Sequence, residues 1–281
     1  MLLQNSSTGA FQVYDISNNV ITNSASLGAV GLDWQVMGFG NFGSFGKTDM
    51  MLRNVDTGAL QVYNINNNQI VGSNSMGLVG LNWQFSGIGN FSGRGTSDML
   101  LRNADTGGLQ VYDINSNQIT GSAFIGTVGV NWEFSGVGNF SSVPGESDLL
   151  LRNSNTGELR VYNISNNEIT GSESLGKVGL DWQFAGVAPI LTADTSDLVL
   201  RNVNTGTFQV YNIANNHLTG SASLGQVGSD WQLGGFAPTT NSGPQPVSGA
   251  PLGSSSQPAA MDGSTAARAG HGQFRRQQRC A

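Results

Sequence analysis

The chain has 281 residues, only 11% of which are charged, and a formal net charge of −6 at pH 7. Residues 1–238 carry 8 basic and 17 acidic side chains, a net charge of −9, whereas residues 239–281 carry four Arg and one Asp. An acidic body lacks the phosphate contacts that hold nucleic acid or an anionic membrane, so composition argues against both partners.

The start of the chain and its cysteine content bear on its location. The first residues, MLLQNSSTGA, lack the basic and apolar regions of a Sec signal peptide, and no segment has the length of a transmembrane helix. The one cysteine, Cys280, excludes an intramolecular disulfide. We expect no transmembrane segment and an extracellular or cell-surface location, reached without a cleavable N-terminal signal. A cytoplasmic location is the alternative.

A unit of about 49 residues recurs five times along the chain. Its tryptophans are separated by 49, 49, 50 and 49 residues, and a tyrosine and an asparagine keep the same register. A period of this size is typical of propellers and solenoids, in which no unit buries its apolar faces alone. The repeated tryptophans are Trp34, Trp83, Trp132, Trp182 and Trp231.

The predicted elements begin at residues 2–5, which match the second strand of a unit, so the chain enters a unit part-way along. In the fourth unit, residues 149–151 form the same strand as an apolar run covered on both faces. Residues 154–157 then supply turn chemistry, because Gly157 can adopt a positive φ.

The remaining elements of that unit are also strands and turns. Residues 159–164 place Leu and Val on one face of a strand and Tyr and Ile on the other. An asparagine-rich turn at 165–167 leads into a third strand through Ile169, and a further strand is built on residues 182–184. No stretch has the 3.6-residue apolar period of a helix. Each unit is therefore predicted to be four short antiparallel strands.

The first and last units are as apolar as the middle ones, which favours a closed ring over a capped linear stack. We predict an all-β fold, a β-propeller of five four-stranded blades in residues 1–238. Residues 231–236 match a first strand and are expected to complete the blade begun at the N-terminus. A fragment of a longer ring is the alternative.

The string Trp-Gln-Phe-x-Gly-x-Gly-Asn-Phe, followed by Ser-Asp-Met-Leu-Leu-Arg-Asn and Thr-Gly, resembles bacterial FG-GAP/VCBS-type propeller repeats. The resemblance covers about residues 1–238. It implies a propeller in a secreted or surface-attached protein that binds sugars or other proteins. It also implies a calcium loop, Asp-x-Asn-Gly-Asp-Gly-x-x-Asp, between the first and second strands.

This chain departs from that pattern where the metal would bind. Each loop offers one Asp and at most one Asn, whereas calcium takes roughly six to eight oxygen ligands. We expect the Asp to accept hydrogen bonds from backbone N–H groups of its turn, with calcium as the less favoured alternative and no other cofactor. The four loops end at Asp49, Asp98, Asp148 and Asp197.

The candidate ligand-binding residues are the five tryptophans and the arginine that recurs at the end of the second strand. A partly exposed Trp would provide a stacking platform for a sugar ring, as the resemblance to propeller lectins implies. A guanidinium at a repeat position either ties blade ends to backbone carbonyls or recognises a ligand, and we favour the structural role. These arginines are Arg53, Arg102, Arg152 and Arg201.

The sequence has few residues of the kinds that catalytic centres use, because His217 and His271 are the only histidines. The chain therefore lacks the histidines needed to build serine–histidine, cysteine–histidine or histidine–zinc centres. Acidic residues in a central channel leave a hydrolase as a remote alternative. Residues 239–281 are rich in Gly, Ser, Pro and Ala with a basic end, and we expect them to form a disordered tail.

The prediction from the sequence is thus a non-catalytic binding module, lectin- or adhesin-like, that binds carbohydrate at several equivalent sites around the ring. Its expected partner is a carbohydrate or a cell-surface protein. The alternative is a structural or protein–protein interaction scaffold. The sequence predicts no oligomeric state.

Overall fold

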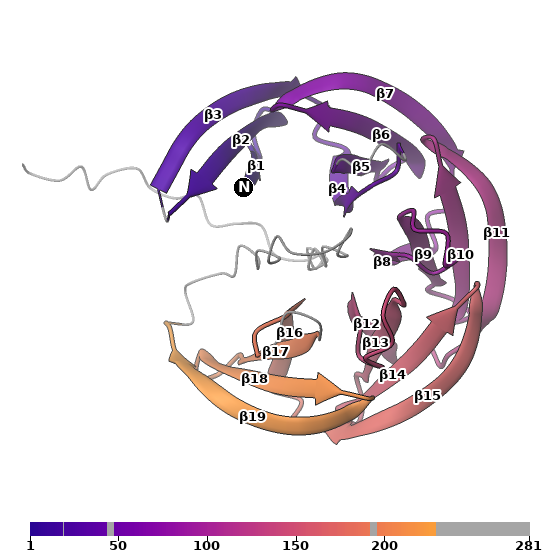
Figure 1. Cartoon of the computed structure of the whole chain (residues 1–281), viewed down its shortest axis with the longest axis vertical. Helices are drawn as coiled ribbons and strands as arrows, with labels where there is room; N and C mark the ends of the chain where they lie inside the picture. The colour runs from indigo at the N-terminus through magenta and orange to yellow at the C-terminus, as the bar shows by residue number, and fades with distance from the viewer. Residues whose placement is uncertain (19, 44–47, 192–195, 229–281) are drawn as a thin grey trace, which may run out of the picture. The chain divides into compact units, whose positions relative to one another are not determined.

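The structure is a computed structural model, and it describes residues 1–18, 20–43, 48–191 and 196–228. These residues form β-strands and turns only, so they contain no helix that could span a membrane. The strands form five antiparallel sheets arranged as a five-bladed β-propeller (Figure 1). The predicted fold class is confirmed.

We number the blades in chain order. Within the described residues, blade 1 consists of β1 (Leu2–Gln4), β2 (Ala10–Ser17) and β3 (Val20–Ala29). The other blades have four strands each: β4 (Trp34–Gly40), β5 (Asp49–Asn54), β6 (Ala59–Asn66) and β7 (Gln69–Leu78) in blade 2; β8 (Trp83–Gly89), β9 (Asp98–Asn103), β10 (Gly108–Asn115) and β11 (Gln118–Thr127) in blade 3; β12 (Trp132–Gly138), β13 (Asp148–Asn153), β14 (Glu158–Ser165) and β15 (Glu168–Lys177) in blade 4; and β16 (Trp182–Ala188), β17 (Asp197–Asn202), β18 (Thr207–Ala214) and β19 (His217–Gln226) in blade 5.

Neighbouring blades are held together by apolar side chains that alternate along the second strand. In β13, Leu150 packs with Leu198 and Leu200 of blade 5. Leu149 and Leu151, on the other face, pack into the cluster shared with blade 3. A strand buried on both faces therefore supplies apolar contacts to two junctions, as its continuous apolar sequence predicts.

The order of strands within a blade runs from the inside of the arrangement to its periphery. The first strands β4, β8, β12 and β16 contact one another in sequence, and so do the last strands β3, β7, β11, β15 and β19. Figure 1 shows the last strands as long arcs along the outer edge. The blades thus stack face to face in chain order.

The turns predicted from Asn and Gly are present. Asn166 and Asn167 have φ values of 50° and 62°, which lets β14 and β15 join through a two-residue turn. The Asn153 side chain accepts hydrogen bonds from the N–H groups of Asn155 and Thr156, both at 3.0 Å. Gly157 follows with a φ of 73°. The matching turn in each of three other blades is capped in the same way by an asparagine side chain of that blade: Asn54, Asn103 or Asn202.

Three sequence predictions concern residues that the structure does not describe. The strand expected at residues 231–236, which would close the ring, lies outside the described residues. So do the tail at 239–281 and the domain boundary at residue 238. β1 does pair with β2 as the other second strands pair with third strands, which confirms that the chain enters blade 1 at its second strand.

Candidate functional site

Each blade has two ends that differ in chemistry. In blade 4, Trp132 starts β12 opposite Asn153, whereas Gly138 ends it opposite Asp148. The repeated Trp and Arg therefore lie at one end, which we call the tryptophan end. The loop between the first and second strands and the turn between the third and fourth lie at the other, which we call the loop end.

The repeated arginines bind the backbone of the next blade. The Arg53 guanidinium donates to the carbonyls of Trp83 at 2.6 Å and Gly80 at 2.9 Å. Gln4, which holds this position in blade 1, donates to the carbonyl of Trp34 at 3.4 Å. This is the structural role expected of a guanidinium at a blade end. The remaining arginines donate to the equivalent glycine carbonyls: Arg102 to Gly129 at 3.1 Å, Arg152 to Gly179 at 2.9 Å and Arg201 to Gly228 at 2.7 Å.

The four described tryptophans are partly buried and pack against the apolar clusters between blades. Each begins the first strand of its blade, and Trp231 lies outside the described residues. The Arg160 guanidinium lies 5.6 Å from the ring centroid of Trp132 and pairs with Glu158 at 2.8 Å. This cation–π contact covers one face of Trp132, so a sugar could stack there only by displacing Arg160. The members of this set are Trp34, Trp83, Trp132 and Trp182.

The aspartates that end the first loops are buried and bind backbone N–H groups. The Asp148 carboxylate accepts from the N–H groups of Phe140 at 2.8 Å and Ser141 at 2.7 Å. Asp49, Asp98 and Asp197 accept from loop N–H groups in the same way. Burial raises the pKa of Asp98 and Asp148, because it disfavours the charged carboxylate. The turn-capping role predicted for these residues is confirmed.

Calcium binding in these loops, the less favoured alternative from the sequence, stays untested. Among the described residues, no three His, Cys, Asp or Glu side chains are grouped so that they could hold a metal ion. The loop in blade 2 is described only in part, since residues 44–47 lie outside the described residues.

Polar side chains join the blades at the loop end. In blade 5, Asn216 donates its side-chain N–H to the Asn163 side chain of blade 4 at 2.8 Å and its backbone N–H to the Phe140 carbonyl at 2.8 Å. Pairs of the same kind join the other described junctions. They are Asn68 with Asp15 at 2.6 Å, Asn117 with Asn64 at 2.6 Å and Asn167 with Asp113 at 2.6 Å.

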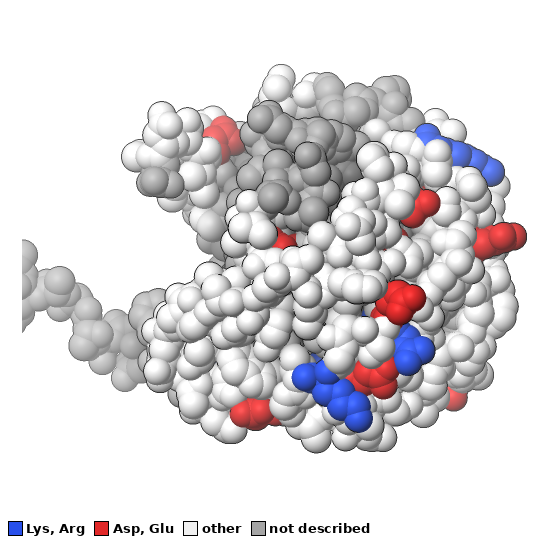
Figure 2. Space-filling model, turned by 60° about the horizontal axis from the view of Figure 1, so that its bottom comes forward, with Lys and Arg blue, Asp and Glu red and all other residues white. Residues whose placement is uncertain are grey.

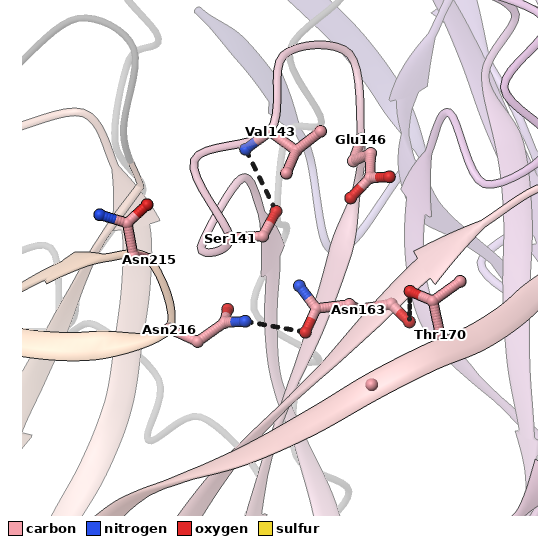
Figure 3. A pocket seen from close by; sticks show the side chains of 8 residues that line it. Ser141, Val143, Glu146, Asn163, Thr170, Asn215 and Asn216 are labelled. Atoms are coloured by element: carbon pink, nitrogen blue, oxygen red, sulfur yellow. Dashed lines mark hydrogen bonds between the residues drawn. The ribbon is translucent and has the colours of Figure 1, made fainter.

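A pocket of about 380 Å³ opens at the loop end between blades 4 and 5 (Figure 3). Three elements form it: the loop between β12 and β13, the facing part of β14 and β15, and the turn between β18 and β19. Its polar groups are two hydroxyls, three side-chain amides and one carboxylate. The lining residues are Ser141, Val143, Glu146, Asn163, Thr170, Gly171, Asn215 and Asn216.

Hydrogen bonds fix much of the pocket wall in place. The Asn163 side chain donates to the buried Asp148 carboxylate at 3.2 Å while it accepts from Asn216. The Asn215 N–H donates to the hydroxyl of Ser142 at 3.1 Å across the junction. Figure 3 shows the Glu146 carboxyl on the pocket side of its loop. A wall held by its own bonds presents its remaining polar groups without first having to be ordered.

At the matching position between blades 3 and 4, the chain supplies a cation of its own. Arg94, in the loop between β8 and β9, pairs with the Asp113 carboxylate at 3.2 Å. Asp113 stands where blade 4 has Asn163, one repeat further along the chain. The loop ends of these two junctions therefore differ in charge, while the equivalent sites expected at the repeated Trp and Arg stay a prediction.

The pocket residues were not among the candidates chosen from the sequence. Asn163 and Asn216 are 53 residues apart and belong to different units, so their pairing depends on how blades stack. One signal was visible: the loop of the third repeat, before Asp148, carries an insertion around Pro144. An insertion at a loop tip is a common place for function.

Comparisons with known proteins give no family for this chain. No family model matches it, and no curated protein matches it. Among solved structures, it is similar to the dihydro-heme d1 dehydrogenase NirN in complex with DHE, with 11% identity and a TM-score of 0.41. That match covers 79% of this chain and 45% of NirN.

Two further structures are similar at the same level. A post-proline cleaving enzyme from Rickettsia typhi has 8% identity and a TM-score of 0.41 over 80% of this chain and 33% of its own. A protein described as a dipeptidyl aminopeptidase IV from Bacteroides ovatus has 11% identity and a TM-score of 0.32 over 78% and 32%. The chain spans less than half the length of each of these proteins, and at these scores the function has to be argued from the site.

Proposed function

We propose that this chain is a non-catalytic, extracellular carbohydrate-binding module of the FG-GAP/VCBS repeat type. The observation that carries this proposal is the polar pocket between blades 4 and 5. Its volume lies within the range of small-molecule sites, and amide, hydroxyl and carboxylate groups converge on it. Sugars present closely spaced hydroxyl groups, so a wall with both donors and acceptors suits them.

The surface around the blades is compatible with a neutral, hydroxylated ligand. On the face shown in Figure 2, acidic and basic side chains are few and interspersed, and most of the surface belongs to uncharged residues. The asparagine–asparagine and asparagine–aspartate pairs at the other described junctions offer places for weaker contacts with the same polymer. Several weak contacts on one rigid body raise the affinity for a multivalent surface.

A glycan array probed with the full chain, with calcium and again with a chelator, tests this proposal. We expect selective binding that does not require calcium. Thr170→Val should weaken binding by about two- to tenfold, because it removes one hydroxyl from the pocket wall. Val71 holds this position in blade 2, so the fold accepts the change. Thr120→Val, the same change in blade 3, is the matched control and should leave binding unchanged. A blank array from folded protein would refute the proposal.

A protein–protein interaction scaffold is the second candidate, favoured by a different observation. At the tryptophan end, one repeat position carries an exposed apolar side chain in each of four blades. These are Leu32 at 60% exposure, Leu81 at 57%, Val130 at 60% and Leu180 at 57%. Exposed apolar residues gathered on one face are typical of a protein interaction surface. If Leu81→Ser and Leu180→Ser abolish binding of a protein partner and retain glycan binding, this second function is supported.

A further inference from the structure

Within its described lining, the pocket between blades 4 and 5 has one acidic side chain and no basic one. Glu146 is the one ionisable side chain in its lining, and the lining contains no Lys or Arg. The buried Asp148 carboxylate lies behind the wall, bonded to Asn163. Like charges disfavour an anionic ligand at such a site, and a cationic group is attracted to it.

At the neighbouring junction, an arginine of the chain itself pairs with an aspartate at the equivalent place. Between blades 3 and 4, the Arg94 guanidinium lies against the Asp113 carboxylate at 3.2 Å, with Asp113 only 5% exposed. The Asp113 carboxylate also accepts from Asn167, the equivalent of Asn216. Between blades 3 and 4, the chain thus places its own cation at the position that corresponds to the pocket between blades 4 and 5.

The sequence differences between the two loops explain why one junction has an internal cation and the other does not. The loop that carries Arg94 reads Asn-Phe-Ser-Gly-Arg-Gly-Thr-Ser-Asp, and the loop that lines the pocket reads Asn-Phe-Ser-Ser-Val-Pro-Gly-Glu-Ser-Asp. The second loop has Val and Pro in place of the arginine, and Glu146 in place of Thr96. It therefore lacks the internal cation and gains a carboxylate.

We propose that the pocket selects sugars that carry a free, protonated amino group, and that Glu146 is the residue that determines this specificity. The proposal rests on the carbohydrate-binding function proposed above and names its ligand class. The ammonium group pairs with the Glu146 carboxylate, while the sugar hydroxyls bond to the Thr170 hydroxyl and the Asn215 amide. Sugars with a carboxylate are repelled.

The test is calorimetric titration of the full chain with short oligomers of glucosamine, N-acetylglucosamine, glucose and glucuronate. We expect glucosamine oligomers to bind about two- to fivefold more tightly than the N-acetylated and glucose oligomers, the range of one partly exposed ion pair, and glucuronate more weakly than either. High salt, or a pH above the pKa of the amine, should abolish the preference.

Glu146→Gln should remove the preference for glucosamine, so that glucosamine and glucose oligomers bind the variant with equal affinity. Glu173→Gln, at an exposed acid on β15 that is not part of the pocket lining, makes the same charge change and should preserve the preference. Equal binding of amino and neutral sugars, or a preference that survives Glu146→Gln, overturns this inference and leaves the carbohydrate-binding function in place. No binding of any oligomer by folded protein overturns both.

Discussion

At the scale of single residues, the repeated arginine is best explained as a tie between blades. Arg152 is 9% exposed, and its guanidinium donates to the Gly179 carbonyl of blade 5 at 2.9 Å. Little of its side chain remains for a ligand. Because blade 1 carries Gln4 at this position, glutamine is a substitution that the fold already uses.

Arg152→Gln is expected to lower the free energy of unfolding by about 1–3 kcal/mol, because the charge-assisted bond to the next blade is lost or lengthened. Affinity for the glycan should not change. Urea unfolding and calorimetric titration measure the two effects, with Lys177→Gln on an exposed part of β15 as the control. A variant that keeps its stability and loses glycan binding would show instead that the arginines form the ligand site.

The buried aspartates predict a dependence of stability on pH. Burial raises the pKa of Asp148 above its ordinary value of 3.8, so the folded state binds this proton more tightly than the unfolded chain. The stabilising contribution is therefore complete below the unfolded pKa and is lost as pH rises through the folded pKa.

Asp148→Asn should make the protein less stable overall, since an amide cannot accept all the bonds of the carboxylate. It should also remove part of the loss of stability expected of the wild type as pH rises above the ordinary pKa of an aspartate. Urea midpoints measured at several pH values for both proteins provide the comparison. Parallel pH profiles would contradict the raised pKa.

At the scale of elements, the turn after the second strand depends on a glycine with positive φ. Gly157 has a φ of 73°, and a Cβ built on it would lie 1.9 Å from the Val178 carbonyl oxygen. Gly157→Ala therefore requires the Val178 carbonyl, just after β15, to move. The alanine must also adopt a backbone conformation that is unfavourable for any residue with a side chain.

We expect Gly157→Ala to lower the free energy of unfolding by more than about 1 kcal/mol. Gly171→Ala is the control, because a Cβ there would lie 3.6 Å from the nearest atom, the side-chain oxygen of Asn163. Differential scanning calorimetry of both variants measures the difference. Equal melting temperatures would mean that this turn tolerates a side chain and that its glycine is not required for stability.

The pocket can be filled without disturbing the blade that carries it. Blade 1 has Asn23 at the repeat position of Gly171, so Gly171→Asn places in the pocket wall a side chain that the fold accepts elsewhere. We expect at least about a tenfold loss of glycan affinity by steric exclusion, with the melting temperature unchanged. Gly220→Asn in blade 5 is the matched control. Undiminished affinity in Gly171→Asn would place the site elsewhere.

The elements show which features the sequence predicts and which it does not. Turns and strands are local, so Gly157, the turn at Asn166 and Asn167 and the capping role of Asp148 were visible in one repeat. The pocket was not visible, because Asn163 and Asn216 meet only when two blades stack. The role of Arg152 was open in the sequence for the same reason: its acceptor belongs to the next blade.

At the scale of the whole molecule, the repeated unit joins neighbouring blades by different interactions at its two ends. The tryptophan end joins blades through arginine–carbonyl bonds, and the loop end joins them through amide pairs. Loop changes at the second end, such as the exchange of Arg94 for Val and Pro, alter one junction without changing the apolar packing between strands. Function can thus differ among junctions while the repeat stays the same.

The pairing of β1 in blade 1 bears on how the ring closes. In the described residues β1 pairs with β2 alone, whereas β5 pairs with strands on both sides. Leu3 of β1 is 50% exposed, while its repeat equivalent in β5, Leu52, is 0% exposed. A further strand beside β1 would complete the pairing of blade 1, and the sequence predicts that residues 231–236 supply it.

Two shortened chains test this closure. Residues 1–238 retain the predicted closing strand, and residues 1–228 lack it. We expect the chain of residues 1–238 to unfold in one transition with the stability of the full chain. The chain of residues 1–228 should lose at least about 1 kcal/mol, because apolar side chains of β1 stay in water. Chemical unfolding followed by tryptophan fluorescence measures both. Equal stability of the two chains would show that blade 1 is complete without residues 229–238, and that the strands of this propeller are closed in another way.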